Sequence, residues 1–525
     1  MYKDFLEKVS PVFEGKTYMI PNPTLAPEER ERRRLAYRNE RILHKRKSSL
    51  SDTPIISMFS EESPYVIYSH EEWWSDAWDP MDYGRDFDFD RTFFDQFRKM
   101  QLEVPRPPLV NNKAENSDYC NFADSNRNSY LITSANDNED CYYGFLMVRN
   151  KDCVDCLWCS DCELAYECKD CRSCYNLRFS ENCENCRDGG FLVGCQGLEN
   201  CFFCVNLRNK KYHLFNEPCS KEIYENMSNY LSGSHKSYQE ALDNFEKLKI
   251  KFPVREANNF ISSDNVSGNN LYNSHNCEKS FDVYDSEDVH YSHDGLKAKD
   301  CSDICFFDGT ELCYESTSLM GYGYRFTSYC RDSSDLFYCD NCHGCKNCFG
   351  CCGLRNKEYC VFNKQYSAED YEKLVPKIIE KMMETKEWGE FFPIENSLFP
   401  YEDTLANDVF PLEKKDEQQV DIAPNEIPDA IEHTGADICD QVLRCEITGK
   451  SFKVIPQEYR FYQKMKLPIP RTSPEARHLD RIRQRPPRSL WERSCQKCAT
   501  AIETAYSPEQ NEKIYCTKCY SGKIY

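Results

Sequence analysis

Four cysteines near the end of the chain have the spacing of a metal site. Cys495-x2-Cys498 and Cys516-x2-Cys519 are separated by seventeen residues. Each pair forms a turn in which two thiolates converge, and two such turns supply the four sulfurs of a tetrahedral zinc site. The strand-like segments ATAIETAY and KIY between the pairs suit a zinc ribbon. All four ligands come from the protein, which favours a structural zinc over a catalytic one; the alternative is four free thiols in a small hairpin.

A second copy of this module lies at the other end of the chain. Residues 21–68 align with 468–515 at one constant offset and share prolines, arginines and apolar residues. The four ligand positions of the N-terminal copy hold Ser48, Ser51, Ser69 and Glu72. This copy cannot hold the same zinc, and we expect packing of Ile55, Ile67 and Tyr68 to keep its shape.

Another ribbon outline begins at Cys445, where a CxxCG…CPxCR pattern would place three more cysteines. Those three positions hold Thr448, Ser473 and Ala476, and the matching N-terminal positions hold Ala26 and Glu29. We expect no zinc at either place.

Most of the other cysteines follow a period of three. Between Cys153 and Cys204 lie twelve cysteines whose spacings are all multiples of three. One metal site or one catalytic thiol does not need such a ladder, whereas a solenoid does, because each turn places a small buried side chain at the same spot. We favour buried reduced thiols. Stacked CxxC pairs could instead chelate metal between coils, at Cys168/Cys171, Cys183/Cys186, Cys201/Cys204, Cys339/Cys342 and Cys345/Cys348.

The solenoid is itself duplicated. Residues 199–224 match 346–371 without a gap, and Glu163-Leu164 with Tyr166-Glu167 recur as Glu311-Leu312 with Tyr314-Glu315. Short apolar runs return about every twelve residues, separated by corners rich in Asp and Asn, which tolerate left-handed backbone. The predicted fold is mainly β, with two cysteine-rich parallel β-solenoid halves, helical linkers and flanking zinc-ribbon-like modules. We expect two strands in each coil.

The predicted organisation has eight parts. They are a degenerate ribbon-like module with a basic helix (1–72), an aromatic and acidic cap (73–116), the first solenoid (117–218), a helical linker (219–262), the second solenoid (263–365), a helical segment (366–395), an acidic linker (396–438) and the zinc-ribbon module (439–525).

The helical segments are expected to cover the open ends of the solenoids, where unpaired edges would invite aggregation. Ser220 and Ser237 are predicted N-caps, the second within a capping box, and that helix should end near Lys249. Ser367 opens the later helix, which Pro376 is expected to break.

Residues 73–97 combine aromatic side chains with Asp76, Asp79, Asp86, Asp88 and Asp90. Paired carboxylates could perform acid/base chemistry, but we favour an apolar plug on the first coil whose aspartates cap turns. The sequence has no nucleophile elbow, phosphate loop or dinucleotide fingerprint. No catalytic residue is predicted, and the chain is more consistent with a non-enzyme.

The overall composition is acidic, with a net charge of -21. No run approaches the ~18 apolar residues of a membrane span, so no membrane association is expected. The start of the sequence lacks a signal-peptide pattern, and the cysteine count is odd, which together predict a cytoplasmic, reducing location. A secreted disulfide scaffold is the alternative.

Two basic segments stand out against this acidic body. We predict that they contact nucleic acid, because phosphates are neutralised locally by arginine. The predicted contact residues are Arg32, Arg33, Arg34, Arg38, Arg41, Arg481, Arg485 and Arg488. The alternative is that these arginines pair with the acidic body of the same chain.

Several strings resemble a large family of cysteine-rich, zinc-ribbon-containing proteins of candidate-phylum bacteria that are uncharacterised. They include VSPVF, RRLAYRNER, WWSDAWDP, FYQKMKLPIPR and the final CxxC pairs, and the similarity covers nearly the whole chain. The family's usual ligand cysteines are missing near Ala26, Glu29, Thr448, Ser473 and Ala476. The resemblance implies an architecture and supplies no mechanism.

The sequence therefore predicts a non-enzymatic, zinc-binding β-solenoid protein. The expected partner is RNA or a ribonucleoprotein. A protein–protein interaction scaffold is the first alternative, and a β-solenoid carbohydrate-active enzyme is the second.

Overall fold

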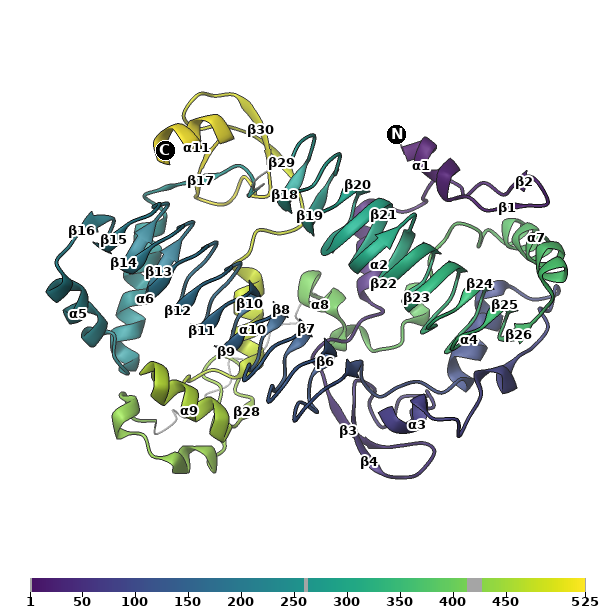
Figure 1. Ribbon diagram of the computed structural model, residues 1–525, viewed down its shortest axis with the longest axis horizontal. Coiled ribbons are helices and arrows are strands. Elements are labelled where there is room, and N and C mark those ends of the chain that lie inside the picture. Colours follow the sequence, from purple (N-terminus) through teal and green to yellow (C-terminus); the bar gives the residue numbers. More distant parts are fainter. Residues whose placement is uncertain (1, 259–262, 413–426, 525) are drawn as a thin grey trace.

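Two parallel β-solenoids lie side by side at the centre of the molecule (Figure 1). The computed structural model describes residues 2–258, 263–412 and 427–524. Residues 259–262 of the predicted helical linker and 413–426 of the predicted acidic linker lie outside the described residues. The predicted mainly-β fold is confirmed, with solenoid coils between 111 and 361 interrupted by a helical connection.

The strands of the first solenoid are short, whereas β21, β22 and β23 of the second have 19, 12 and 10 residues. The first solenoid contains β5 (Asn111–Asn112), β6 (Asn121–Asp124), β7 (Thr133–Asn136), β8 (Phe145–Val148), β9 (Lys151–Val154), β10 (Leu157–Ser160), β11 (Glu163–Tyr166), β12 (Tyr175–Arg178), β13 (Arg187–Val193), β14 (Glu199–Val205), β15 (Lys211–Leu214) and β16 (Glu217–Pro218). The second contains β18 (Gly268–Tyr272), β19 (Ser280–Tyr284), β20 (Glu287–His290), β21 (His293–Glu311), β22 (Tyr314–Arg325), β23 (Ser328–Phe337), β24 (Lys346–Phe349), β25 (Glu358–Val361) and β26 (Lys364–Gln365).

A regular coil has twelve residues and four corners, whereas in the second solenoid some coils are one residue shorter, as where Thr317 pairs with Ser328. In the first solenoid Thr133 pairs with Phe145 and Phe145 with Leu157, so every residue lies above the one twelve positions earlier. From Phe122 to Phe215, every third residue has a positive φ, which bends the chain at that point. The predicted twelve-residue repeat is confirmed, but a coil has four three-residue sides instead of two strands. Many corners are Asp or Asn, which adopt this left-handed backbone more readily than other residues.

The period of three arises because one residue of each side faces the interior. From Ser117 to Cys204, every residue whose number is a multiple of three is buried. A buried thiol also satisfies the backbone of the next coil: the Sγ of Cys159 donates to the carbonyl of Cys168 (3.4 Å), and that of Cys171 donates to Ser180 (3.5 Å). Cysteine combines a small apolar side chain with a weak donor, which suits this narrow interior.

Helices cover the far end of each solenoid, as predicted. The helices α5 (Lys221–Tyr230) and α6 (His235–Lys249) pack on the last coils of the first solenoid, and α7 (Ala368–Glu384) packs on β25 of the second. Ser220 and Ser367 are the predicted N-caps of α5 and α7.

Two helix predictions were wrong in detail. The N-cap of α6 is Ser234, whose hydroxyl accepts a hydrogen bond from the backbone N–H of Ser237, so this helix begins earlier than predicted. The helix α7 continues through Pro376. Val375, Pro376 and Ile379 lie on the buried face of this helix, and their packing outweighs the loss of one backbone hydrogen bond.

The remaining elements surround the solenoids. At the N-terminal side are α1 (Tyr2–Val9), β1 (Val12–Phe13), β2 (Lys16–Thr17), α2 (Pro27–Leu35), β3 (His44–Lys47), β4 (Pro54–Ser57), α3 (His70–Trp74), η1 (Pro80–Tyr83) and α4 (Phe93–Glu103). Towards the C-terminus are η2 (Ile394–Asn396), η3 (Tyr401–Asp403), α8 (Leu405–Val409), η4 (Ile431–His433), η5 (Ala436–Cys439), β27 (Leu443–Arg444), β28 (Ser451–Phe452), α9 (Pro456–Met465), α10 (Pro474–Arg483), β29 (Trp491–Ser494), β30 (Ala501–Thr504), β31 (Lys513–Tyr515) and α11 (Thr517–Ile524). Of the described helices, none is both long enough and apolar enough to cross a membrane.

The repeated end modules dock crosswise: each packs on the solenoid that lies farther from it in the sequence. The helix α2 packs on β21 and β22 of the second solenoid, whereas its counterpart α10 lies against the first solenoid (Figure 1). The two helices approach each other through α8, and Leu35, Phe145, Leu157 and Cys305 belong to one apolar cluster at this junction. The modules therefore join the two solenoids into one body.

The aromatic segment does form a plug, but it covers a different place from the one predicted. Trp73, Trp78, Phe87 and Phe93 share one core with late coils of the second solenoid. Phe93 contacts Phe362 with ring centroids 5.3 Å apart. Two of the five aspartates cap turns as predicted: Asp79 accepts a hydrogen bond from the N–H of Met81, and Asp88 accepts one from the N–H of Asp90. Asp86 instead pairs with Lys364 (2.7 Å).

Twenty-eight of the thirty-three cysteines are buried, and none is in a disulfide. In native, reduced protein, we expect a polar thiol reagent to titrate at most the five others, Cys219, Cys439, Cys498, Cys516 and Cys519. All thirty-three should react after denaturation. Rapid reaction of more than five thiols in the native state would contradict the closed solenoid interior.

Candidate metal centre

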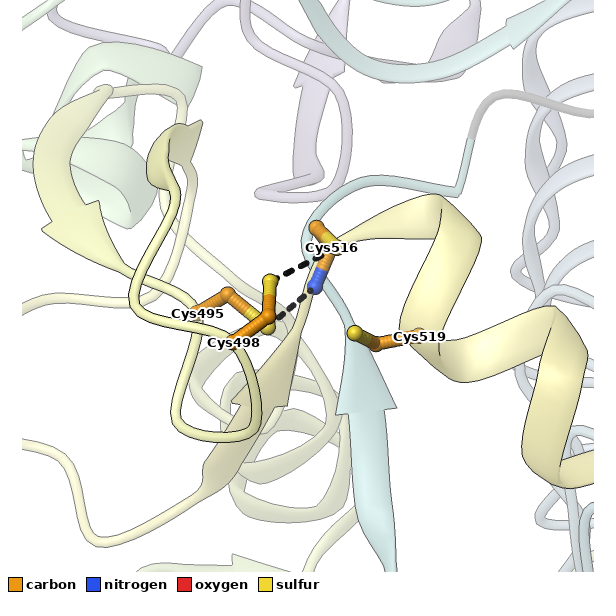
Figure 2. A group of neighbouring side chains, drawn as sticks. All are labelled: Cys495, Cys498, Cys516 and Cys519. Atoms are coloured by element: carbon orange, nitrogen blue, oxygen red, sulfur yellow. Dashed lines mark hydrogen bonds between the residues drawn. The ribbon is translucent and has the colours of Figure 1, made fainter.

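The four C-terminal cysteines converge from two turns of a small ribbon. Cys495 and Cys498 lie in the turn between β29 and β30, while Cys516 and Cys519 lie at the start of α11. Figure 2 shows the four side chains gathered between this turn and the helix. Ala499 has a φ of 59° and donates its N–H to the carbonyl of Cys495, which closes the first turn tightly.

The sulfur positions fit one tetrahedral metal ion. All four Sγ atoms lie within 4.8 Å of one another, and those of Cys498 and Cys516 are 3.7 Å apart. Tetrahedral coordination with a Zn–S distance of about 2.3 Å places sulfurs about 3.8 Å apart. The four cysteines are therefore positioned to bind a metal ion.

Backbone N–H groups prepare one ligand for this role. The N–H of Cys516 donates to the Sγ of Cys495 (3.2 Å). Although burial opposes the charged form, N–H groups of Cys516, Lys497 and Cys498 lower the pKa of Cys495 to about 6. A thiolate is the form that binds metal, so these hydrogen bonds favour coordination near neutral pH.

The ribbon is attached to the connection between the solenoids. Strand β31 pairs in parallel with β17 (Pro253–Arg255), which follows α6. Next to it, the carboxylate of Glu256 accepts from the N–H of Thr517 (2.8 Å), and its carbonyl accepts from the hydroxyl of Thr504 (2.6 Å). Glu256 thus contacts both the hairpin and the helix that carry the cysteines.

The N-terminal copy has the same shape without sulfur ligands. Its hairpin β3–β4 and helix α3 correspond to β29–β30 and α11 at the offset of the sequence repeat. Glu72 lies at the fourth ligand position, where its carboxylate accepts hydrogen bonds from the hydroxyl of Ser48 and from the N–H of Ser69. These bonds outweigh burial and lower the pKa of Glu72, so a hydrogen-bonded carboxylate connects the two turns.

At the third ribbon outline one thiol remains. Cys445 is buried, and although burial raises its pKa, hydrogen bonds from Thr448 and Ser473 lower the pKa to about 7. Ala476 at the fourth position has no ligand atom. Among the described residues, Cys495, Cys498, Cys516 and Cys519 are also the one set of three or more Cys, His or acidic side chains whose ligand atoms approach within 4.8 Å. The interior cysteine pairs do not form such a set.

The arginines of α2 predicted to contact nucleic acid are mostly turned inward. Arg32 is exposed, but Arg33 and Arg34 are buried and bind the carboxylate of Glu315 at 2.7 and 2.6 Å. Burial disfavours the charged form of Arg34, yet Glu315 and Asp303 raise its pKa. Beyond the helix, Arg38 pairs with Glu40, and Arg41 pairs with Asp408 (3.3 Å).

The second basic segment is used in the same way. Arg481 binds Asp155 and Glu167 of the first solenoid, each at 3.0 Å. Arg485 binds Asp170 of the first solenoid (2.8 Å) and Asp282 of the second (2.6 Å). Arg488 pairs with Asp294 and with Glu31. These contacts match the alternative interpretation of the sequence, in which the arginines pair with the acidic body of the same chain. The paired arginines therefore do not form a free cationic surface.

The carboxylate partners were missed in the sequence although a signal was present. Glu167 and Glu315 are equivalent residues of the duplicated halves, and each lies twelve positions after another acid, Asp155 or Asp303. Corner residues twelve positions apart stack in one column on the outside of a solenoid. Two stacked acidic residues in each half, Asp155 with Glu167 and Asp303 with Glu315, therefore form a binding site for the arginines of one helix.

Comparison with known proteins identifies no family for the chain. No protein-family model matches it, and no curated protein is significantly similar to it. The resemblance to the candidate-phylum family stays a prediction.

The ion pairs predict a large difference between neighbouring arginines of α2. Arg34→Met should lower the free energy of unfolding by about 3–5 kcal/mol, because it leaves buried carboxylates without a partner. Arg32→Met, the matched control on the exposed side, should change it by less than about 0.5 kcal/mol. Urea denaturation followed by circular dichroism measures both. Equal effects would contradict the buried network.

The metal site predicts a stoichiometry. Purified chain should contain one metal ion, and Cys498→Ser should lose it, as measured by inductively coupled plasma mass spectrometry. Cys439→Ser, which changes a partly exposed cysteine outside the site, should retain it. A metal content that is unchanged by Cys498→Ser would exclude this site as the ligand set.

Proposed function

We propose that this chain is a non-enzymatic protein-interaction scaffold fastened by one structural zinc ion. The observation that carries the proposal is the four-cysteine site on a ribbon that is paired with β17, in the connection between the solenoids. Zinc is the metal that four thiolates at these distances suit best. With four protein ligands the ion has no open position for a substrate, which supports a structural role.

The distribution of charge supports a protein partner over a polynucleotide. Seven of the eight predicted contact arginines are buried or partly buried and ion-paired within the chain. Their charge is neutralised locally, while the net charge of the chain is -21. An acidic surface repels phosphates. RNA binding is therefore the second candidate function, and it would have to use residues other than these arginines.

The outer sides of the coils offer a regular surface instead. Glu139 lies between Arg127 (2.6 Å) and Lys151 (3.2 Å) along one column of the first solenoid. These side chains are part-exposed, so their ion pairs contribute little to stability and can be exchanged for contacts with a partner. Extended repeat surfaces of this kind are typical of binding proteins.

Affinity purification from native lysate, with and without nuclease, tests the proposal. We expect protein partners that resist nuclease and that are reduced by the double variant Arg127→Glu/Lys151→Glu. Arg32→Glu, an exposed charge reversal on α2, is the matched control and should retain them. Partners that disappear with nuclease, or salt-dependent binding to an RNA pool, would favour the nucleic-acid proposal.

A further inference from the structure

A cavity of about 530 Å³ lies where three parts of the chain meet. Its walls come from α3, from the first coils of the first solenoid and from the later coils of the second; Trp74, Lys113, Asp124, Arg331 and His343 are among the residues that line it. This volume is typical of small-molecule sites, and a junction between structural units is a common place for them. The cavity is separate from the four-cysteine site.

One wall of the cavity is aromatic. Trp74 is 44% exposed, although it belongs to a segment whose other tryptophans are buried in the plug. The rings of Trp74 and His343 are 5.4 Å apart between centroids, and Tyr329 approaches His343 at 5.7 Å. An exposed ring of this kind presents a face on which a planar group can stack.

Polar groups beside this wall have unused hydrogen-bonding capacity. The Nε2 of His343 lies 3.0 Å from the Oδ1 of Asn341, which can only accept, so the imidazole donates. Burial, with Arg331 and Arg355 nearby, lowers the pKa of His343 to about 3, so its Nδ1 remains an acceptor at neutral pH. Asn341 is 2% exposed and its Nδ2 is buried, so its role at the cavity is to hold the imidazole of His343 in place.

The charged side chains of the cavity are available to different degrees. Arg355 donates to the carbonyls of Trp73 (2.7 Å) and Trp78 (3.2 Å), which fixes its position. Within the described part of the chain, neither Arg331 nor Lys113 has a carboxylate at ion-pair distance, in contrast to the arginines of α2 and α10. Three cationic side chains and two carboxylates, those of Asp124 and Asp332, leave a net charge of about one positive unit in the lining.

We propose that this cavity binds a nucleotide carrying one phosphate group. The base stacks on Trp74 and its edge donates to the Nδ1 of His343, while Arg331 and Lys113 bind the phosphate. A phosphate monoester carries about two negative charges, which the two cations without carboxylate partners, Arg331 and Lys113, can neutralise, whereas a polyphosphate carries more. This site goes beyond the scaffold function and depends neither on the metal nor on a protein partner.

Two sources present the same base and phosphate: a free mononucleotide and the terminal nucleotide of an RNA strand. The acidic surface favours the free nucleotide, because it repels the further phosphates of a strand. Titration with both kinds of probe therefore distinguishes the sources. If the affinities for the mononucleotide and for the RNA strand fall equally when Trp74 or Arg331 is replaced, both probes bind in this cavity.

The test is titration of the full chain with AMP, GMP, CMP and UMP, and with a short oligoribonucleotide, followed by tryptophan fluorescence and isothermal calorimetry. We expect at least one of them to bind more tightly than ribose 5-phosphate and inorganic phosphate, with quenching of tryptophan emission. Trp74→Ala should weaken binding about tenfold or more, because stacking on an aromatic ring is lost, and Trp74→Phe should restore part of it. Arg331→Met should weaken binding of the nucleotide but not of the corresponding nucleoside.

Matched controls lie on the same chain but away from the cavity. Trp491→Ala in the ribbon and Arg187→Met on the first solenoid should leave the affinity unchanged, and circular dichroism verifies that each variant is folded. The proposal is overturned if no mononucleotide binds at millimolar concentration. It is also overturned if ribose 5-phosphate binds equally well, or if the controls lose as much affinity as the cavity variants.

Discussion

Buried arginine–carboxylate pairs hold the two solenoids in one arrangement. A solenoid satisfies its backbone within its own stack, so it has no directional bond left to offer a neighbour. Arg485, which binds Asp170 of one solenoid and Asp282 of the other, supplies such a bond. The bidentate shape of a guanidinium makes the contact specific, whereas the net stabilisation is small because two charges must leave water. The main effect of these pairs is therefore to select which surfaces meet.

The two ribbon modules have the same fold, but different groups join the hairpin turn to the following helix in each. In the C-terminal copy four sulfurs converge where a metal ion would bind. In the N-terminal copy the carboxylate of Glu72 accepts hydrogen bonds at the corresponding place. Both devices connect the hairpin turn to the start of the following helix. The difference is that a metal–thiolate centre depends on pH and on metal supply, whereas a hydrogen-bonded carboxylate does so much less.

The repeat pattern allowed much of the fold to be predicted from sequence. The period of three among the cysteines and the return of apolar runs after twelve residues follow directly from one inward residue on each side of a coil. The convergence of the four C-terminal cysteines was also predictable, because a local CxxC turn brings two thiols together by itself. The number of sides in a coil was not, since Asp, Asn and bulky residues such as Phe122 all occupy left-handed corners.

The roles of the arginines could not be predicted in the same way. A run such as Arg32-Arg33-Arg34 has the same composition on a surface and in a buried seam, and its partners lie hundreds of residues away. The cavity was missed for a similar reason, because Trp74, Lys113 and His343 come from three separate parts of the chain. Local pattern determines coils and turns, whereas long-range packing determines which charges are neutralised.

The crosswise docking of the end modules has a consequence for synthesis on the ribosome. Arg30 binds Asp303, which is 273 residues further along the chain. At about 5–20 residues per second, the N-terminal helix waits roughly 14–55 s before its partner has been made. The first solenoid can wind its coils during this interval, since each coil contacts only its neighbours. Arg30, Arg33 and Arg34 of the nascent N-terminal module therefore emerge hydrated, long before Asp303 and Glu315 have been made. Docking of this module on the second solenoid becomes a late event in assembly.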